Sequence, residues 1–461
     1  AAPAPGTARE AGDTDAVAWA AYQRIHSDFF DLDKTVKSDP REIELGRQLF
    51  FDPRLSGNGA MSCATCHDPS RAWGDALPRG RGLGHKELTR NTPSLLTVHR
   101  NIPHPFFWDG RADSIEKAIL TALQSRLEMD RDPRLLVVDL SRVPAYTEAF
   151  RLLYGPEGIS PDRLARAIGA FIKAEIRPGE TPFDRYRTDS AAMTPAAKRG
   201  MDLFAGKARC LLCHTGAFFS DDFFHNVGLS PTPGLDDPGR GALVKEKHSH
   251  RAFHTPPLRD VTRTGPYMHD GRDKDLAAVI EFYNRGGDVH DESQDSLVKP
   301  LGLTAAERAD LLAFLQALTS PDREARFPAL PPARGPRSGA EGYAYARSRV
   351  DAATAALRAG RKDLAWAQAA SLLELAPSWK RVGGGACVDR VAREASSLQQ
   401  ATDGSGDASA LARRVSAAVD SCRPASGVTT TAAGPGAPAL GSLAQSDAEI
   451  AEASGLLAAA E

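Results

Sequence analysis

The chain of 461 residues lacks several features that would narrow its function at once. No apolar run reaches the length of a membrane span, so we expect no transmembrane helix. No strongly basic stretch occurs and the formal net charge is −2, which argues against a nucleic-acid-binding protein. Strand-like patterns are sparse. The remaining composition is that of an ordinary globular protein, long enough for two or three domains.

Cysteine is scarce, but its six residues are arranged in three pairs. Two pairs read C-x-x-C-H, in the motifs Cys63-x-x-Cys66-His67 and Cys210-x-x-Cys213-His214. In a c-type haem site the two thiols add to the haem vinyl groups and the histidine ligates the iron. A zinc site or two redox disulfides would also use paired cysteines, but neither explains a histidine after both pairs. The motifs therefore predict two covalently bound c-type haems.

The compartment follows from these motifs and from the start of the chain. The sequence opens on Ala1-Ala2-Pro3 without an initiator methionine, as a chain does after a signal peptide is removed. Attachment of c-type haem takes place outside the bacterial cytoplasm, so we expect a periplasmic protein. In an oxidising compartment the remaining pair, Cys387 and Cys422, is expected to form a disulfide that stabilises a small domain.

An internal repeat divides the chain between about residues 40 and 320. Four blocks recur in the same order, each C-x-x-C-H motif lying between a Leu-Phe pair and a Thr-Pro block, with an Asp-Gly-Arg block and a helix after them. The blocks are Leu49-Phe50, Thr92-Pro93-Ser94-Leu95 and Trp108-Asp109-Gly110-Arg111, then Leu203-Phe204, Thr255-Pro256-Pro257-Leu258 and His269-Asp270-Gly271-Arg272. We therefore expect a mainly α fold with two tandem cytochrome c-like haem domains and a C-terminal helical bundle.

Composition and apolar periodicity predict the boundaries of these parts. The expected parts are a flexible arm (1–17), an N-terminal cytochrome domain (18–177), a C-terminal cytochrome domain (178–320), a linker (321–339), a helical domain (340–424) and a low-complexity tail (425–461). Capping residues and period predict helices that begin at Asp113 or Ser114, near 161, at Thr194-Pro195, at Asp275 and at Thr304.

The two haem sites differ at one helical position. Thirteen residues after the aspartate of each Asp-Gly-Arg block stand Ala122 in the first half and Tyr283 in the second. Tyr283 lies on the apolar stripe of its helix, where its phenol could ligate the second iron opposite His214 or serve as a core aromatic. Met268 is a rival ligand. Ala122 has no ligating atom, so the first haem is expected to have an open face.

An open haem that reacts with peroxide needs a group that moves a proton between the peroxide oxygens. Glu128, after the helix of the first Asp-Gly-Arg block, is the candidate for this role, although a solvated surface glutamate is also possible. Trp108 lies beside the loop before that helix and is a candidate for electron transfer between the haems, or a core tryptophan.

Residues 40–320 resemble the family of bacterial dihaem cytochrome c peroxidases and MauG. The matching segments are Leu49-Phe50-Phe51-Asp52-Pro53-Arg54-Leu55-Ser56, Arg90-Asn91-Thr92-Pro93-Ser94-Leu95, Phe107-Trp108-Asp109-Gly110-Arg111-Ala112 and Pro266-Tyr267-Met268-His269-Asp270-Gly271. The resemblance implies that His67 holds the peroxide-reactive haem, that Glu128 is its distal acid/base, and that Trp108 relays electrons. It also implies a calcium ion between the domains, bound by Asn91 with the carbonyls of Thr264 and Pro266.

The same resemblance bears on the sixth ligand of the second haem. Ordinary peroxidases of the family have a methionine where this chain has Tyr283, whereas MauG-like members have a tyrosine. The resemblance therefore implies that Tyr283 ligates the second iron with His214, and that Met268, in a neighbouring loop, does not. Two positions depart from the family pattern: Ala118 stands where a distal glutamine is common, and His85 lies two residues out of register with the histidine that gates the first haem in some peroxidases.

Three functions are weighed against these features. The leading hypothesis is a periplasmic enzyme that uses H₂O₂ to form high-valent haem iron and oxidises a side chain of a partner protein by long-range electron transfer. The alternative is a cytochrome c peroxidase that reduces H₂O₂ with electrons from a small cytochrome c or cupredoxin. A non-catalytic electron carrier would need two six-coordinate irons, and Ala122 argues against it.

Overall fold

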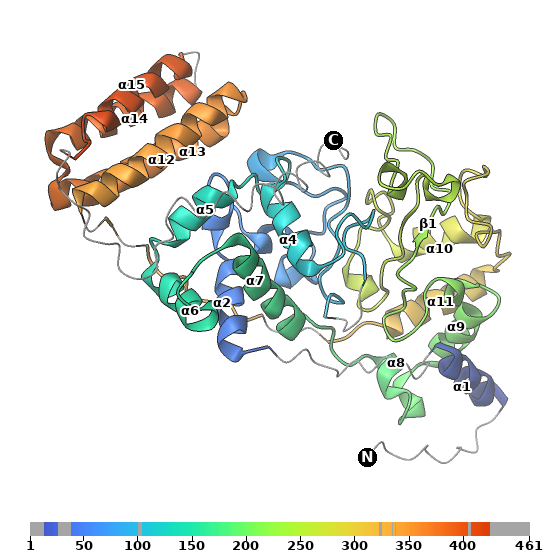
Figure 1. Ribbon diagram of the computed structural model, residues 1–461. Helices are drawn as coiled ribbons and strands as arrows, with labels where there is room; N and C mark the ends of the chain where they lie inside the picture. The colour runs from blue at the N-terminus through green and yellow to red at the C-terminus, as the bar shows by residue number, and fades with distance from the viewer. Residues whose placement is uncertain are drawn as a thin grey trace.

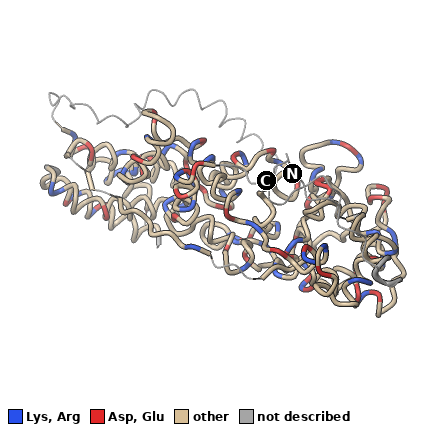
Figure 2. Tube along the Cα trace, turned by 90° about the horizontal axis from the view of Figure 1, so that it is seen from below, with Lys and Arg blue, Asp and Glu red and all other residues tan. Residues whose placement is uncertain are grey.

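The computed structural model describes residues 13–25, 38–99, 104–321, 325–333, 335–336, 338–403 and 407–424. Over these residues the fold is mainly helical, as predicted, and the strands β1 (Phe224–His225) and β2 (Phe253–His254) form one short antiparallel sheet. None of the described helices is long and apolar enough to cross a membrane. The helices gather in an elongated molecule with a helical bundle at one end (Figures 1 and 2).

The first half of the repeat folds around one apolar core. Its elements are α2 (Pro40–Phe50), η1 (Pro53–Leu55), α3 (Cys63–Cys66), η2 (Pro69–Arg71), η3 (Leu83–His85), α4 (Ile115–Gln124), α5 (Pro133–Leu140), α6 (Pro144–Tyr154) and α7 (Pro161–Glu175). Helices α2 and α7 cross closely at Gly46, where an added Cβ would lie 1.8 Å from the carbonyl oxygen of Ala167. Only glycine allows this crossing.

The second half folds around its own core. Its elements are α8 (Pro182–Arg185), η4 (Ser190–Ala192), α9 (Pro195–Ala205), η5 (Cys210–Leu212), η6 (Arg240–Ala242), η7 (Lys247–Ser249), η8 (Val261–Arg263), α10 (Leu276–Arg285) and α11 (Ala305–Ala317). Helices α9 and α11 cross at Gly200, where an added Cβ would lie 1.9 Å from the carbonyl oxygen of Asp310. This contact repeats the crossing at Gly46, and the repeat seen in the sequence is therefore a repeat of packing.

Helix α1 (Asp13–Ile25) corrects two expected boundaries. We expected residues 1–17 to form a flexible arm, but residues 13–17 are helical; residues 1–12 lie outside the described part. We also expected residues 18–25 to belong to the first domain, but Ala18, Ala21, Tyr22 and Ile25 are buried in the core of the second half. The rings of Tyr22 and Phe183, 5.0 Å apart, show this packing. The helix therefore packs where its apolar side chains are buried, and not against the domain that follows it in the sequence.

The predicted helix starts agree with the observed caps. Ser114, rather than Asp113, caps α4 by accepting a hydrogen bond from the amide of Lys117. Thr194, Asp275 and Thr304 cap α9, α10 and α11 in the same way. These local signals are strong because a capping oxygen satisfies amides that have no partner inside the helix.

The C-terminal bundle has a third core. It consists of α12 (Gly339–Arg358), α13 (Lys362–Trp379), the π-helical turn η9 (Lys380–Gly384), α14 (Gly385–Asp403) and α15 (Ala408–Asp420). Cys387 and Cys422 form a disulfide between α14 and the end of α15, with Cα atoms 5.4 Å apart. The bundle lies beside α5 (Figure 1), and Val138 of α5 packs against its core. The expected low-complexity tail, 425–461, lies outside the described residues.

Candidate active site

The first C-x-x-C-H motif forms a single helical turn, α3, that fixes the orientation of His67. Ser62 and Thr65 form a reciprocal capping box at its start, and the amide of His67 donates to the carbonyl of Cys63 at 2.9 Å. The Nδ1 atom of His67 lies 3.1 Å from the carbonyl oxygen of Trp73. Donation from Nδ1 leaves the lone pair on Nε2, which is the form that ligates a metal.

The second motif repeats this arrangement. The amide of His214 donates to the carbonyl of Cys210, and Nδ1 lies 2.9 Å from the carbonyl oxygen of Phe219. Burial lowers the pKa of both motif histidines, against the effect of these carbonyls, so the imidazoles are neutral. Two neutral imidazoles, each oriented by a main-chain carbonyl and each next to a pair of cysteines, fit the donor set of two c-type haems.

The four motif cysteines do not form disulfides with one another. Burial raises the pKa of Cys63 and of Cys210 to about 12, so these thiols are protonated. Zinc requires thiolates gathered around one ion. Among the described residues, one group of metal-ligating side chains comes close together, and it contains a single cysteine, Cys213, with Asp221 and His225. In the described part of the chain the four motif cysteines are therefore not gathered around one point, as a shared four-cysteine zinc site would require.

Glu128 lies in the turn that follows α4, on the Cys66 side of the first haem motif. Its carbonyl accepts a hydrogen bond of 2.8 Å from the amide of Leu83. The side chain is half-buried, and this burial raises the pKa of its carboxyl, while the neighbouring Arg111 guanidinium offsets part of the rise. Its charge, after burial and Asp75, also helps to raise the pKa of Cys66. A carboxyl of raised pKa near Cys66 has the properties of an acid/base group.

Trp108 lies at the junction between the two halves. Its indole Nε1 donates to the carbonyl of Asn91 at 2.9 Å, and its own carbonyl accepts from the amide of His254 at 2.8 Å. The amide of Asn91 in turn donates to the carbonyl of His269 at 2.7 Å. Trp108 is thus attached directly to the second half and, through Asn91, to the loop of the second Asp-Gly-Arg block.

The junction contains an ion-pair cluster that the sequence did not reveal. Arg90 bridges Asp109 of the first half, at 2.6 Å, and Asp237 of the second, at 2.7 Å. In the sequence, the one indication of a role for Arg90 was that it directly precedes Asn91. The Asp-Gly-Arg turns also interlock, because an added Cβ at Gly110 would meet the ring of Phe224, and one at Gly271 would meet Pro78. The two halves are therefore held in a fixed relation around Trp108.

Tyr283 lies near the second pair of cysteines, on α10. Burial and the sulfurs of Cys213 and Cys210, in that order, raise the pKa of its phenol. The first half has Ala122 at the equivalent position of α4, and Ala118 one turn earlier; both are half-buried. The rival Met268 lies in the turn closed by the bridge between Tyr267 and Asp273 and has a positive φ of 69°. Ligation by Tyr283 stays a prediction supported by this proximity.

The other predicted residues occupy the junction or the surface. The Asn91 side chain is buried and donates from Nδ2 to the carbonyl of Leu77 at 2.8 Å. The carbonyls of Thr264 and Pro266 flank Gly265, five and three residues before the His269 that Asn91 contacts. Calcium binding at these atoms stays a prediction. His85, weighed as a switchable ligand, is exposed and has a left-handed backbone at φ 61°.

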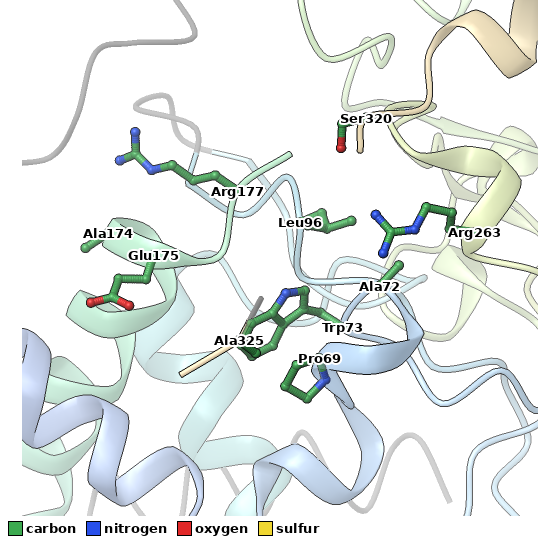
Figure 3. A pocket seen from close by; sticks show the side chains of 10 residues that line it. All are labelled: Pro69, Ala72, Trp73, Leu96, Ala174, Glu175, Arg177, Arg263, Ser320 and Ala325. Atoms are coloured by element: carbon green, nitrogen blue, oxygen red, sulfur yellow. The ribbon is translucent and has the colours of Figure 1, made fainter. Parts of the chain in front are cut away.

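A polar cavity of about 390 Å³ opens on the Trp73 side of the first site, lined by residues of both halves (Figure 3). Trp73, Glu175, Arg177 and Arg263 are among its lining residues. The cavity lies on the side of Trp73, whose carbonyl orients His67, and Glu128 is not among its lining residues.

The sequence also provided no sign of a half-buried histidine beside the second motif. His225 lies between two carboxylates, with Nε2 2.9 Å from Asp221 and Nδ1 2.5 Å from Asp295. Hydrogen bonds to Asp221, to the Cys213 sulfur and to Asp295 raise the pKa of His225 to about 11 in spite of burial. Seventy residues separate His225 from Asp295, so no local pattern could have predicted the contact.

Comparisons with known proteins agree with this geometry. Residues 40–192 match the family model described as "Di-haem cytochrome c peroxidase". The methylamine utilization protein MauG of Methylorubrum extorquens is 41% identical over 298 residues, covering 63% of this chain and 82% of that protein. Cytochrome-c peroxidase IdrP2 of Denitromonas iodatirespirans is 33% identical, with coverages of 63% and 84%. The crystal structure of a MauG-like protein associated with microbial copper homeostasis superposes with a TM-score of 0.58 at 29% identity, covering 64% of this chain and 95% of that one.

Proposed function

Because this chain belongs to the dihaem cytochrome c peroxidase and MauG family and thus acts on H₂O₂, we propose that it uses H₂O₂ to oxidise a side chain of a partner protein by long-range electron transfer. The proximity of Tyr283 to Cys210 and Cys213 carries this proposal. A phenolate ligand favours higher oxidation states of iron than a thioether does. The second haem would then hold oxidising equivalents rather than deliver electrons.

The residues that hold the two haems are those of the motifs. Cys63 and Cys66 would attach the first haem and His67 would ligate it, while Cys210 and Cys213 would attach the second, with His214 and Tyr283 as its ligands. When bound, the haems supply the redox chemistry, in which H₂O₂ takes two protons and two electrons and leaves as two molecules of water. The electrons come from the partner protein, whose side chain is oxidised without entering a pocket.

The protein residues contribute a proton path and an electron path. A carboxyl oxygen of Glu128 takes the proton from one peroxide oxygen and returns it to the other, which leaves as water. The raised pKa of Glu128 suits a group that both accepts and donates a proton. Trp108, whose indole donates to the carbonyl of Asn91, would conduct electrons between the haems.

Two features of the chain extend this proposal. Calcium bound by Asn91, Thr264 and Pro266 would stiffen the junction at which Trp108 lies, since oxygen ligands of this kind suit Ca²⁺. The Cys387–Cys422 disulfide is typical of an oxidising compartment and supports a periplasmic location.

The alternative is a peroxidase that reduces H₂O₂ with electrons from a small cytochrome c or cupredoxin. A relative named as a cytochrome-c peroxidase supports this alternative, because it matches the same share of the chain as the MauG protein does. Such an enzyme would use the second haem as the entry point for electrons, and a thioether ligand would suit that task better than Tyr283.

One experiment separates the two functions. Stoichiometric H₂O₂ is added to the fully oxidised, haem-loaded protein, and both irons are followed by optical and Mössbauer spectroscopy. A prompt change at both irons without any reductant, lost in Tyr283→Phe and kept in the bundle control Tyr343→Phe, supports oxidation of a partner protein. A reaction that begins only after one haem is reduced would establish the peroxidase alternative.

A further inference from the structure

The C-terminal bundle contacts the first half at the loop that carries Glu128. Arg361, the residue before α13, pairs with the carboxylate of Asp130, two residues after Glu128. The two side chains are only 15% and 13% exposed. A largely desolvated ion pair of this kind holds its partners more firmly than a surface pair, which contributes little.

Asp130 has a backbone that transmits this contact to the loop. Its φ is +47°, a left-handed conformation that aspartate and asparagine tolerate better than most residues. Its amide donates to the carbonyl of Ser125 at 2.9 Å, and the amide of Glu128 donates to the same carbonyl at 3.1 Å. Residues 125–130 therefore form one closed turn, and Arg361 holds it at Asp130.

The next turns of α13 support the same loop from a second side. Gln368 Nε2 lies 3.5 Å from the carbonyl oxygen of Gly57, whose amide donates to the carbonyl of Met129 at 2.8 Å. An added Cβ at Gly57 would lie 2.3 Å from the carbonyl oxygen of Asp130 and 2.9 Å from the side chain of Leu364. The main chain at Gly57 is thus packed closely between the loop and α13.

A second ion pair fixes the far end of the loop. Asp139 of α5 pairs with Arg131, the residue after Asp130, and with Arg349 of α12 at 3.2 Å. Arg349 is 1% exposed and also donates to Gln368 Oε1 at 3.1 Å. Burial raises the pKa of Asp139, but Arg349 and Arg131 together hold it below its usual range, so the carboxylate is ionised. If the bundle moved away from the first half, Arg349 would lose the carboxylate of Asp139. Leaving a buried arginine without its partner costs free energy, so the ion pair stabilises the docked arrangement.

We infer that the C-terminal bundle is a positioning module for the peroxide site, with Arg361 as the positioning residue that holds, through Asp130, the loop presenting Glu128. This inference rests on the proposed function, in which Glu128 moves the peroxide proton. The bundle contributes no group to the reaction itself; it acts by restricting where the Glu128 carboxyl can lie. Placement errors of about 1 Å cost up to about a hundredfold in rate.

The test compares Arg361→Ala with Arg358→Ala, which removes an exposed arginine of the same bundle. Hydrogen–deuterium exchange of the haem-loaded protein is measured for peptides covering 122–131, together with the rate at which H₂O₂ changes the Soret band. We expect R361A to exchange faster at residues 125–131 and to react about tenfold more slowly, and R358A to behave as the parent. Asp130→Asn, which suits the left-handed backbone, is expected to reproduce both effects of R361A.

The E128Q background separates the inference from the proposed function on which it rests. If Arg361 acts through Glu128, R361A adds no further slowing in E128Q, although the exchange still increases. Equal exchange and equal rates in R361A and R358A would overturn the inference, as would a full tenfold effect of R361A in the E128Q background. If E128Q alone leaves the peroxide rate unchanged, the proposed role of Glu128 is wrong and the inference falls with it.

Discussion

The indole of Trp108 donates a hydrogen bond of 2.9 Å to the main-chain carbonyl of Asn91, whose amide is bonded to the carbonyl of His269 in the other half of the repeat. A tryptophan at a domain junction is often only a packing residue. Here the ring nitrogen is bonded to the first half, at Asn91, and the main chain to the second half, at His254.

The first prediction concerns this indole. Trp108→Phe keeps an aromatic ring but loses the Nε1 donor, and a phenyl ring requires a higher potential for its oxidation than an indole does. We expect peroxide to react at the first haem at a rate close to that of the parent, whereas oxidation of the second haem slows at least about tenfold. Stopped-flow spectroscopy that resolves the two haems measures both steps. Trp366→Phe, at an exposed tryptophan of the bundle, is the control. Equal loss of both steps would assign Trp108 a structural role.

The second prediction concerns the proton path. Glu128→Gln keeps the shape of the side chain but removes the base, and we expect the peroxide reaction to slow by about 10²- to 10³-fold. In the parent the rate falls as pH falls through the raised pKa of Glu128, because the base is the carboxylate. The variant loses this step in its pH profile. Glu116→Gln on α4, whose partner is Lys173, is the matched control and should retain it.

The same substitution has a predictable effect on stability. A carboxyl whose pKa is raised in the folded protein adds stability at low pH, and this contribution is lost as pH rises through the folded pKa. Above that pH, the parent buries a charged group and E128Q does not. We therefore expect the free energy of unfolding of E128Q to equal or exceed that of the parent at neutral pH, measured by guanidinium denaturation. A less stable variant would mean that the carboxylate has favourable partners in the fold.

The third prediction concerns His225 and its two carboxylates. Its pKa rises from an ordinary value of 6.5 to about 11. The stability from this raised pKa is fully present below the ordinary value and is lost as pH rises toward the folded value. Once Cys213 carries a haem its sulfur is a neutral thioether, and Asp221 and Asp295 remain the charged partners. His225→Gln should therefore lower the free energy of unfolding by about 3 kcal/mol near pH 6.

The pH dependence distinguishes this effect from simple loss of packing. The destabilisation by H225Q should shrink steadily as pH is raised above the ordinary value of 6.5, whereas a packing defect would persist unchanged. His248→Gln, at an exposed histidine of the same half, serves as the control and should show no destabilisation at any pH. Guanidinium denaturation of the haem-loaded protein at several pH values provides the measurement.

Local chemistry explains what the sequence could predict. Capping residues such as Ser114 and Thr304 act within four residues of the amides they satisfy, so the helix starts were readable. The C-x-x-C-H motifs likewise contain their own geometry, because the histidine Nδ1 finds a carbonyl only five or six residues further on. The equivalence of Ala122 and Tyr283 followed from aligning the two halves of the repeat with each other.

Contacts between distant segments could not be predicted in the same way. The sequence of residues 13–25 does not indicate which core receives α1, and the helix packs against the core of the second half rather than the first. Arg361 and Asp130 are 231 residues apart, and each is one of many charged residues in an ordinary composition. Basic and acidic residues are scattered over the described part of the chain trace (Figure 2), so charge alone did not mark this pair.

The last prediction tests whether the repeat is one of packing as well as of motifs. Gly46 and Gly200 occupy equivalent places, 154 residues apart, and at each an added Cβ would lie less than 2 Å from a carbonyl oxygen of the crossing helix. Main-chain atoms cannot move aside as a side chain can, so Gly46→Ala and Gly200→Ala should each destabilise the protein by about 2–3 kcal/mol.

Gly169→Ala on α7 is the matched control, since its nearest neighbours are side-chain atoms of Ile115 and Glu116 at 3.1 and 3.2 Å that can shift. Guanidinium unfolding, followed at the Soret band, measures all three. A loss at Gly46 without a comparable loss at Gly200 would show that the two helix crossings do not contribute equally, and that the second half depends on other contacts, such as those of α1.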